Sequence, residues 1–227
     1  MLNRLNHEFI MKNILKDIYS NPHLQSSICL KGGTCLYLFY ELDRFSVDLD
    51  FNLVSQEFNS NLLTNILEKY INIEDFTNKY FTWFWLGGYE KGSQKIKIEI
   101  SKIDYPDSYI NQSFYGLTIP IMSTACMFAH KLCAITDRTK LQNRDLYDAN
   151  FMFSKMFDID DNIIKTRTGL STKDYLNKLV EFIEIRKDRI NILEGLGELI
   201  SDSQKDKIKN GLINELITNI KIRIDTY

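Results

Sequence analysis

The sequence feature that most constrains the fold is a pair of glycines followed by an alternating segment with two aspartates. Gly32 and Gly33 end a short apolar run and precede a segment with helical character. The segment 46–53 then alternates, so Asp48 and Asp50 project from one side of a strand and apolar residues project from the other. The pattern predicts a strand, a tight turn, a helix and a second strand in succession.

Composition is typical of a globular protein. Hydrophobic residues make up 44% and charged residues 26% of the 227 residues, which excludes a disordered chain. The formal net charge of −2 gives no global positive field for nucleic acid, but it allows a local basic patch. The four cysteines include no Cys-x-x-Cys pair, which disfavours a zinc site and a disulfide framework. Because no export signal or membrane-length apolar run is found, we expect a cytoplasmic protein that does not enter a membrane.

Helical and strand patterns follow each other along the first half of the chain. Residues 5–20 and 60–72 have helical spacing. The runs 79–90 and 93–103 are typical of two strands of a hairpin with a glycine-containing turn. In the second run the isoleucines face the core, and Glu99 lies on the polar side with Lys95 and Lys97.

The second half of the chain is predicted to be mainly helical. The extended segment 118–123 leads into a helix that ends near Asp137, with Ser123 or Thr124 as its N-cap. Residues 144–157 form another helix, and a weak break follows. Ser171 begins a capping box with Asp174, after which the chain is helical to its end.

Three carboxylates are candidates for a metal site. Asp48 and Asp50 lie about 6 to 7 Å apart along one side of a strand, where like charges repel unless a cation lies between them. Hard oxygen ligands of this kind suit Mg²⁺ better than zinc. If the strand carrying Glu99 is a neighbour, three carboxylates converge, as an in-line phosphoryl displacement with two metal ions requires. The alternative is a solvated strand face.

The Gly32-Gly33 turn adds a second element to this pattern. Glycine lets the backbone approach a ligand closely, and amides at the start of a helix point toward anions. The alternative is a plain strand-to-helix turn. Together with Asp-x-Asp on the next strand, the turn favours a bound nucleoside triphosphate and its magnesium ions.

This combination resembles the DNA polymerase β-like nucleotidyltransferase superfamily. The segments "LKGGTCLYLFY" and "RFSVDLDF" are similar in particular to the AbiEii/AbiGii toxin family of bacterial toxin–antitoxin and abortive-infection systems. Arg44, Phe45 and Ser46, which precede Asp48, are part of the resemblance.

A later motif, "HKLCAITDRTKLQNRDLYD", extends the resemblance. Lys131 and Arg138 are seven residues apart and share a helix face, and Asp145 and Asp148 are three apart and share another. The resemblance implies that Lys131 binds the triphosphate and that Asp145 completes the site. A charged helix surface with local ion pairs is the alternative.

The resemblance implies an α+β fold with a nucleotidyltransferase catalytic core, residues 1–155, and a C-terminal helical region, residues 156–227. The core would have a small mixed sheet flanked by helices. Two Mg²⁺ ions, with Mn²⁺ as the alternative, would be held by Asp48, Asp50 and Glu99. The catalytic set adds Lys131 and Asp145. The nucleotide would be bound by residues from both motifs, namely Gly32, Gly33, Thr34, Arg44, Ser46, Lys131 and Arg138.

The implied reaction moves a nucleoside monophosphate from an NTP to an acceptor hydroxyl and releases pyrophosphate. The resemblance implies an RNA acceptor, with the 3′ end of tRNA as the first expectation, and a separately encoded antitoxin. A small molecule or a protein hydroxyl as acceptor, and a catalytically inactive binding module, remain alternatives. His130 as a general base and the aromatic run 80–85 as a base-stacking surface are further options, each weighed against simple packing.

Overall fold

The computed structural model of the protein describes residues 2–92 and 94–227. The chain folds as two compact units. The first consists of Met1–Asp104 and Ser108–Met122, and the second consists of Tyr105–Asp107 and Ser123–Tyr227. The first unit contains the sheet, whereas the second is helical.

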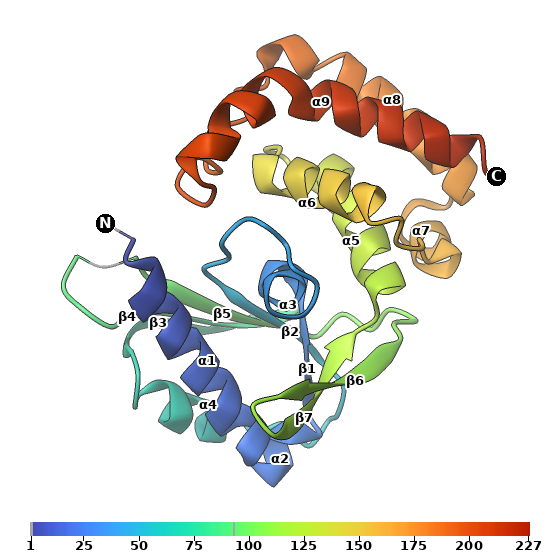
Figure 1. Cartoon of the computed structure of the whole chain (residues 1–227). Coiled ribbons are helices and arrows are strands. Elements are labelled where there is room, and N and C mark those ends of the chain that lie inside the picture. The colour runs from blue at the N-terminus through green and yellow to red at the C-terminus, as the bar shows by residue number, and fades with distance from the viewer. Residues whose placement is uncertain (1, 93) are drawn as a thin grey trace. The chain divides into compact units, whose positions relative to one another are not determined.

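A mixed sheet of seven strands, counted over the described residues, forms the centre of the first unit, in the order β3-β4-β5-β2-β1-β7-β6 (Figure 1). β2 pairs antiparallel with β1 and parallel with β5, while β1 pairs parallel with β7. The remaining neighbours are antiparallel. The strands are β1 Ile28–Lys31, β2 Leu49–Leu53, β3 Asn72–Asn78, β4 Thr82–Gly88, β5 Ile96–Ser101, β6 Tyr109–Phe114 and β7 Leu117–Met122.

The helices of the first unit are α1 Arg4–Ser20, α2 Pro22–Gln25, α3 Gly32–Phe39 and α4 Ser60–Leu67. One face of α1 is buried, and α1 packs against α4 and β7; the buried apolar residues are Ile10, Met11, Ile14, Leu15, Ile18 and Tyr19. Trp85 of β4 is fully buried, and its indole Nε1 donates a hydrogen bond of 3.0 Å to Thr64 Oγ1 of α4. The face of β4 that carries Trp85 therefore belongs to the core of this unit.

The second unit is a set of packed helices: α5 Thr124–Asp137, α6 Asn143–Ser154, α7 Asp161–Thr168, α8 Thr172–Glu184, a short 3₁₀ helix at Lys187–Arg189, and α9 Asp202–Ile224. Figure 1 shows α9 lying along α8 and α6, and these pairs are in contact. The predicted N-caps are observed, since Ser123 accepts from the Cys126 N–H and Ser171 from the Asp174 N–H. No helix within the described ranges is long and apolar enough to cross a bilayer.

The predicted α+β class is confirmed, but four elements differ from the sequence-based prediction. The helix expected over 60–72 ends at Leu67, and β3 begins at Asn72. β3 and β6 were not predicted because both are edge strands with largely exposed residues, and so lack the apolar alternation that marks a buried strand. The expected break after residue 157 contains α7, which Asp160 caps and Gly169 ends in the left-handed conformation.

Candidate functional site

The pairing of β2 with β5 brings the three predicted carboxylates to one face of the sheet. The two strands are parallel neighbours, and Asp50 lies directly opposite Glu99. Asp48, two residues before Asp50, projects to the same side. The alternate residues on the opposite face, among them Phe51 and Ile98, are fully buried, so the hydrophobic core fixes which way the carboxylates point.

Lys97 lies among these carboxylates. Its ammonium Nζ is 3.8 Å from Asp48 Oδ2, 3.5 Å from Asp50 Oδ1 and 3.4 Å from Glu99 Oε2. The side chains of the three acids are 16%, 31% and 39% exposed, so the cluster is accessible from solvent. The sequence analysis placed Lys97 on the polar side of its strand but did not assign it to the site. The missing information was the pairing of β5 with β2.

The Gly32-Gly33 turn packs directly against the acidic cluster. Gly32 has φ +77°, and a Cβ added to it would lie 2.9 Å from Asp50 Oδ2. A Cβ on Gly33 would lie 2.8 Å from Arg44 Nη2 and 2.9 Å from Ser46 Oγ. A Cβ at either position would therefore displace the neighbouring polar side chains. The turn is also the start of α3, whose first amides have no partner within the helix.

Three of the predicted nucleotide-binding residues hold the loop that carries Asp48. The Thr34 hydroxyl donates to the main-chain carbonyl of Asp48 and lies 2.9 Å from the Ser46 hydroxyl. Arg44 is buried, and its Nη1 donates to the Phe45 carbonyl at 3.0 Å. In this arrangement these side chains position the loop, and their predicted contact with nucleotide stays a prediction.

His7 supports the same loop from α1, and the sequence analysis did not identify it. Its ring is buried, with Nε2 2.9 Å from the Val47 carbonyl and Nδ1 3.3 Å from the Tyr89 hydroxyl. Burial lowers the pKa of His7 below its ordinary value, against the smaller raising effect of the Val47 carbonyl. No local pattern could have revealed this role, because His7 and Val47 are distant in sequence.

The later charged motif forms a cluster of its own within the second unit. Lys131 Nζ of α5 lies 3.2 Å from Asp145 Oδ1 and 2.7 Å from Asp148 Oδ2 of α6, and both carboxylates are buried. Arg138 Nε lies 3.0 Å from Asp145 Oδ2, yet that oxygen accepts no hydrogen bond. This contact is therefore an ion pair in which the N–H does not point at the oxygen. The shared contact with Lys131 agrees with the prediction that the two aspartates lie on one helix face, whereas their position beside Lys131 did not follow from spacing.

His130 is held on both ring nitrogens. Nε2 lies 2.7 Å from Asp107 Oδ1, and Nδ1 lies 2.8 Å from Arg167 Nη1. A guanidinium can only donate, so Nδ1 accepts and Nε2 donates to Asp107. Both nitrogens being engaged, the structure favours a structural role for His130 over that of a general base.

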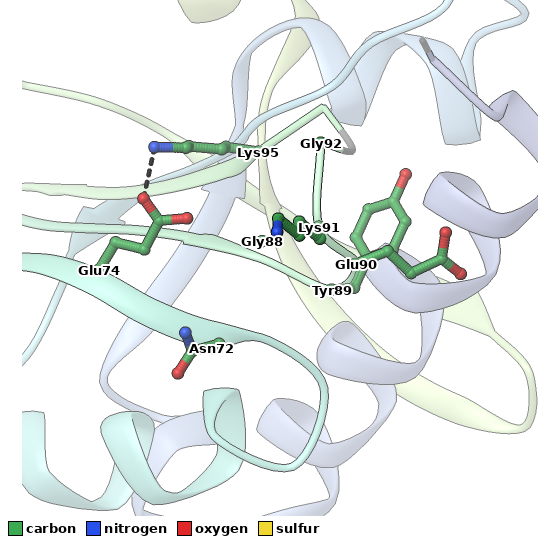
Figure 2. A pocket seen from close by; sticks show the side chains of 8 residues that line it. All are labelled: Asn72, Glu74, Gly88, Tyr89, Glu90, Lys91, Gly92 and Lys95. Carbon is green, nitrogen blue, oxygen red and sulfur yellow. Dashed lines mark hydrogen bonds and ion pairs between the residues drawn. The ribbon is translucent and has the colours of Figure 1, made fainter.

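An open pocket of about 460 Å³ lies at the turn between β4 and β5, away from the carboxylates. Figure 2 shows Lys95 paired with Glu74 across it. Tyr89 and Glu90 contact α1 instead, through His7 and Asn6. The lining contains no group of catalytic side chains within the described residues, so we place the candidate site at the acidic cluster.

Comparisons with known proteins concern the family and the fold. The family model described as "Nucleotidyl transferase AbiEii toxin, Type IV TA system" matches residues 13–199, which include the glycine turn, the carboxylates and the later motif. The crystal structure of JHP933 from Helicobacter pylori has a TM-score of 0.64 at 22% identity, covering 98% of this chain and 92% of that one. A second H. pylori crystal structure, of a protein provisionally assigned as a nucleotidyltransferase, has a TM-score of 0.61 at 24% identity, covering 98% and 95%. No curated protein matches the chain.

Proposed function

The chain belongs to the AbiEii nucleotidyl transferase toxin family of type IV toxin–antitoxin systems, and we propose that it transfers a nucleoside monophosphate from an NTP to a hydroxyl of an RNA, with the 3′ end of tRNA as the first candidate. In this reaction the acceptor oxygen forms a bond to the α-phosphorus. The bond between the α- and β-phosphates breaks, and pyrophosphate leaves. The observation that carries the proposal is the convergence of Asp48, Asp50 and Glu99 beside the Gly32-Gly33 turn.

The acidic cluster has the donor chemistry for Mg²⁺ or Mn²⁺, because all its candidate ligands are carboxylate oxygens. The Lys97 ammonium, which lies within 4 Å of all three, supports a position for positive charge among them. Within residues 2–92 and 94–227, no three acidic, histidine or cysteine side chains are already arranged around a metal position. Asp48, Asp50 and Glu99 would therefore have to close in on the ion. A bound divalent ion would neutralise charge on the triphosphate and make the acceptor hydroxyl more acidic.

The residues of the chain have separate parts in this proposal. Gly32 and Gly33 let Asp50 and Arg44 pack against the start of α3, where the N-terminal amides of the helix would bind the phosphates. Glu99, the most exposed of the three acids, is placed to take the proton of the acceptor hydroxyl. Lys131, Arg138 and Asp145 are proposed for the triphosphate on the strength of the family motif, and that assignment is tested separately below.

Family membership supports a toxin with a separately encoded antitoxin. An RNA acceptor is supported by the same membership and by the turn between β3 and β4. There Tyr80 and Phe81 are 86% and 57% exposed. Exposed aromatic rings are a common stacking surface for unpaired bases.

A transfer assay tests the proposal. Wild type, Asp48→Asn and the control Asp75→Asn, which changes an exposed carboxylate on β3, would each be incubated with Mg²⁺, bulk tRNA and one α-labelled NTP at a time. We expect label in tRNA for wild type and the control, and at least a hundredfold less for Asp48→Asn. Equal labelling by Asp48→Asn would overturn the site assignment. Label found instead in protein or in small molecules would replace the RNA acceptor by one of those classes.

A further inference from the structure

Lys97 is bound differently from an ordinary surface lysine. Charge-assisted hydrogen bonds between ammonium and carboxylate groups are about 2.7 to 2.9 Å long. The three contacts of Lys97 measure 3.4 to 3.8 Å and come from two neighbouring strands. The ammonium donates one long hydrogen bond to Glu99 Oε2 and lies within 4 Å of Asp48 and Asp50, so its charge is shared among the three carboxylates.

Lys95 provides the internal comparison. It lies two residues earlier, on the same side of the chain as Lys97, and makes a single close ion pair with Glu74. That pair is half-exposed and lies at the pocket shown in Figure 2, whose lining does not include Asp48 or Asp50. These two neighbouring lysines thus have different environments. Of the two, Lys97 is the one whose positive charge lies among the carboxylates of the acidic cluster.

We propose that Lys97 is the resident counter-ion of the acidic cluster and that a divalent cation displaces its ammonium when it binds. This inference rests on the proposed metal site. A metal ion needs direct contact with the carboxylate oxygens at about 2.1 Å, and an ammonium at the centre of the same oxygens would repel it. The lysine stem is long and flexible, so the ammonium can leave without any change in the strand.

The displacement has a functional consequence for the same site. Without metal, Lys97 keeps three like charges together on a sheet face where they would otherwise repel each other. Once displaced, the ammonium stays tethered within reach of the cluster, where the triphosphate brings further negative charge. Lys97 would then exchange carboxylate partners for phosphate oxygens, so that metal and nucleotide bind cooperatively.

The test measures Mn²⁺ affinity without nucleotide, by calorimetry and by the electron paramagnetic resonance signal of free Mn²⁺. The variants are Lys97→Met, Lys97→Arg and the matched control Lys95→Met. Displacing one ammonium from three partly exposed carboxylates corresponds to roughly a tenfold change in affinity. We therefore expect Lys97→Met to bind Mn²⁺ about tenfold more tightly than wild type. Lys97→Arg and Lys95→Met should stay near the wild-type value.

Asp48→Asn shows whether the measured Mn²⁺ ion binds at the acidic cluster, because this variant should weaken Mn²⁺ binding in the wild-type and Lys97→Met backgrounds alike. Equal or weaker binding by Lys97→Met would overturn the inference and leave the metal site standing. No Mn²⁺ binding by any variant would overturn both the inference and the metal assignment. Should Lys97→Met not fold without metal, a tighter Mn²⁺ site in Lys97→Gln would support displacement, and an unchanged one would refute it. Tighter binding by Lys97→Met in a protein that transfers no nucleotide would support the inference and refute only the proposed reaction.

Discussion

Replacing Gly32 by alanine tests whether the Asp50 carboxylate must stay where the turn holds it. A left-handed residue such as Gly32, at φ +77°, becomes less favourable by about 1 kcal/mol when it carries a Cβ. The added Cβ would also lie 2.9 Å from Asp50 Oδ2, whereas ordinary contact begins near 3.4 Å. The carboxylate must therefore retreat by the difference, about 0.5 Å.

Gly116→Ala is the matched control. Gly116 lies in the same unit, in the turn between β6 and β7, with φ +81° and no atom within 4 Å of an added Cβ. Both substitutions therefore introduce the same backbone strain, and each should lower the midpoint of thermal unfolding by about 4 °C. Only Gly32→Ala moves a carboxylate.

The assay compares initial rates of nucleotidyl transfer and Mn²⁺ affinity for the two variants at a temperature where both are folded. A displacement of 1 Å in an active site can lower the rate about a hundredfold, so half of that predicts about a tenfold loss for Gly32→Ala. Gly116→Ala should transfer at the wild-type rate. Equal rates and equal Mn²⁺ affinities for the two alanine variants would refute the reasoning that the turn holds the Asp50 carboxylate in the position that transfer and metal binding require.

Two further predictions concern the loop support and the later motif. The pKa of His7 is lower in the folded protein than in the unfolded chain, so as the pH falls the unfolded chain binds a proton at this ring before the folded protein does. The free energy of unfolding should therefore fall as the pH decreases below about 6.5. Urea unfolding at pH 7 and pH 5.5 should show this fall reduced in His7→Asn and unchanged in the exposed-site control His23→Asn. Lys131→Met removes the ammonium that pairs with two buried carboxylates and should destabilise the protein by about 3 kcal/mol. Adding Asp148→Asn removes one of these buried negative charges and should restore much of the lost stability. If that double variant is stable and still transfers nucleotide at the wild-type rate, Lys131 does not bind the triphosphate.

Local patterns were sufficient for the parts of the site that lie on one segment. Alternation placed Asp48 and Asp50 on one side of a strand, because the apolar residues between them are buried. Helical spacing placed Asp145 and Asp148 on one face of a helix, and the serine caps were identified from short motifs. Each of these inferences needs only the next few residues of the chain.

Contacts between distant segments could not be predicted in the same way. The sequence analysis could state that Glu99 joins the site only if its strand neighbours the Asp-x-Asp strand, and the parallel pairing of β2 with β5 supplies that condition. The position of Lys97 and the contact of His7 with Val47 depend on similar long-range pairing. β3 and β6 escaped prediction because their side chains are mostly exposed, and exposure removes the hydrophobic period.

The same burial that defines the fold also determines the charge arrangement of the site. Leu49 and Phe51 on β2, and Ile98 and Ile100 on β5, have no exposed surface. A slip of one residue in either strand would turn these apolar side chains to the opposite face and bury a carboxylate in their place, which is strongly unfavourable. The register that sets Asp50 against Glu99 is therefore fixed by the hydrophobic core. Because the core holds the acids together regardless of their mutual repulsion, the site needs a cation at all times, and Lys97 lies where its ammonium can supply that charge in the absence of metal.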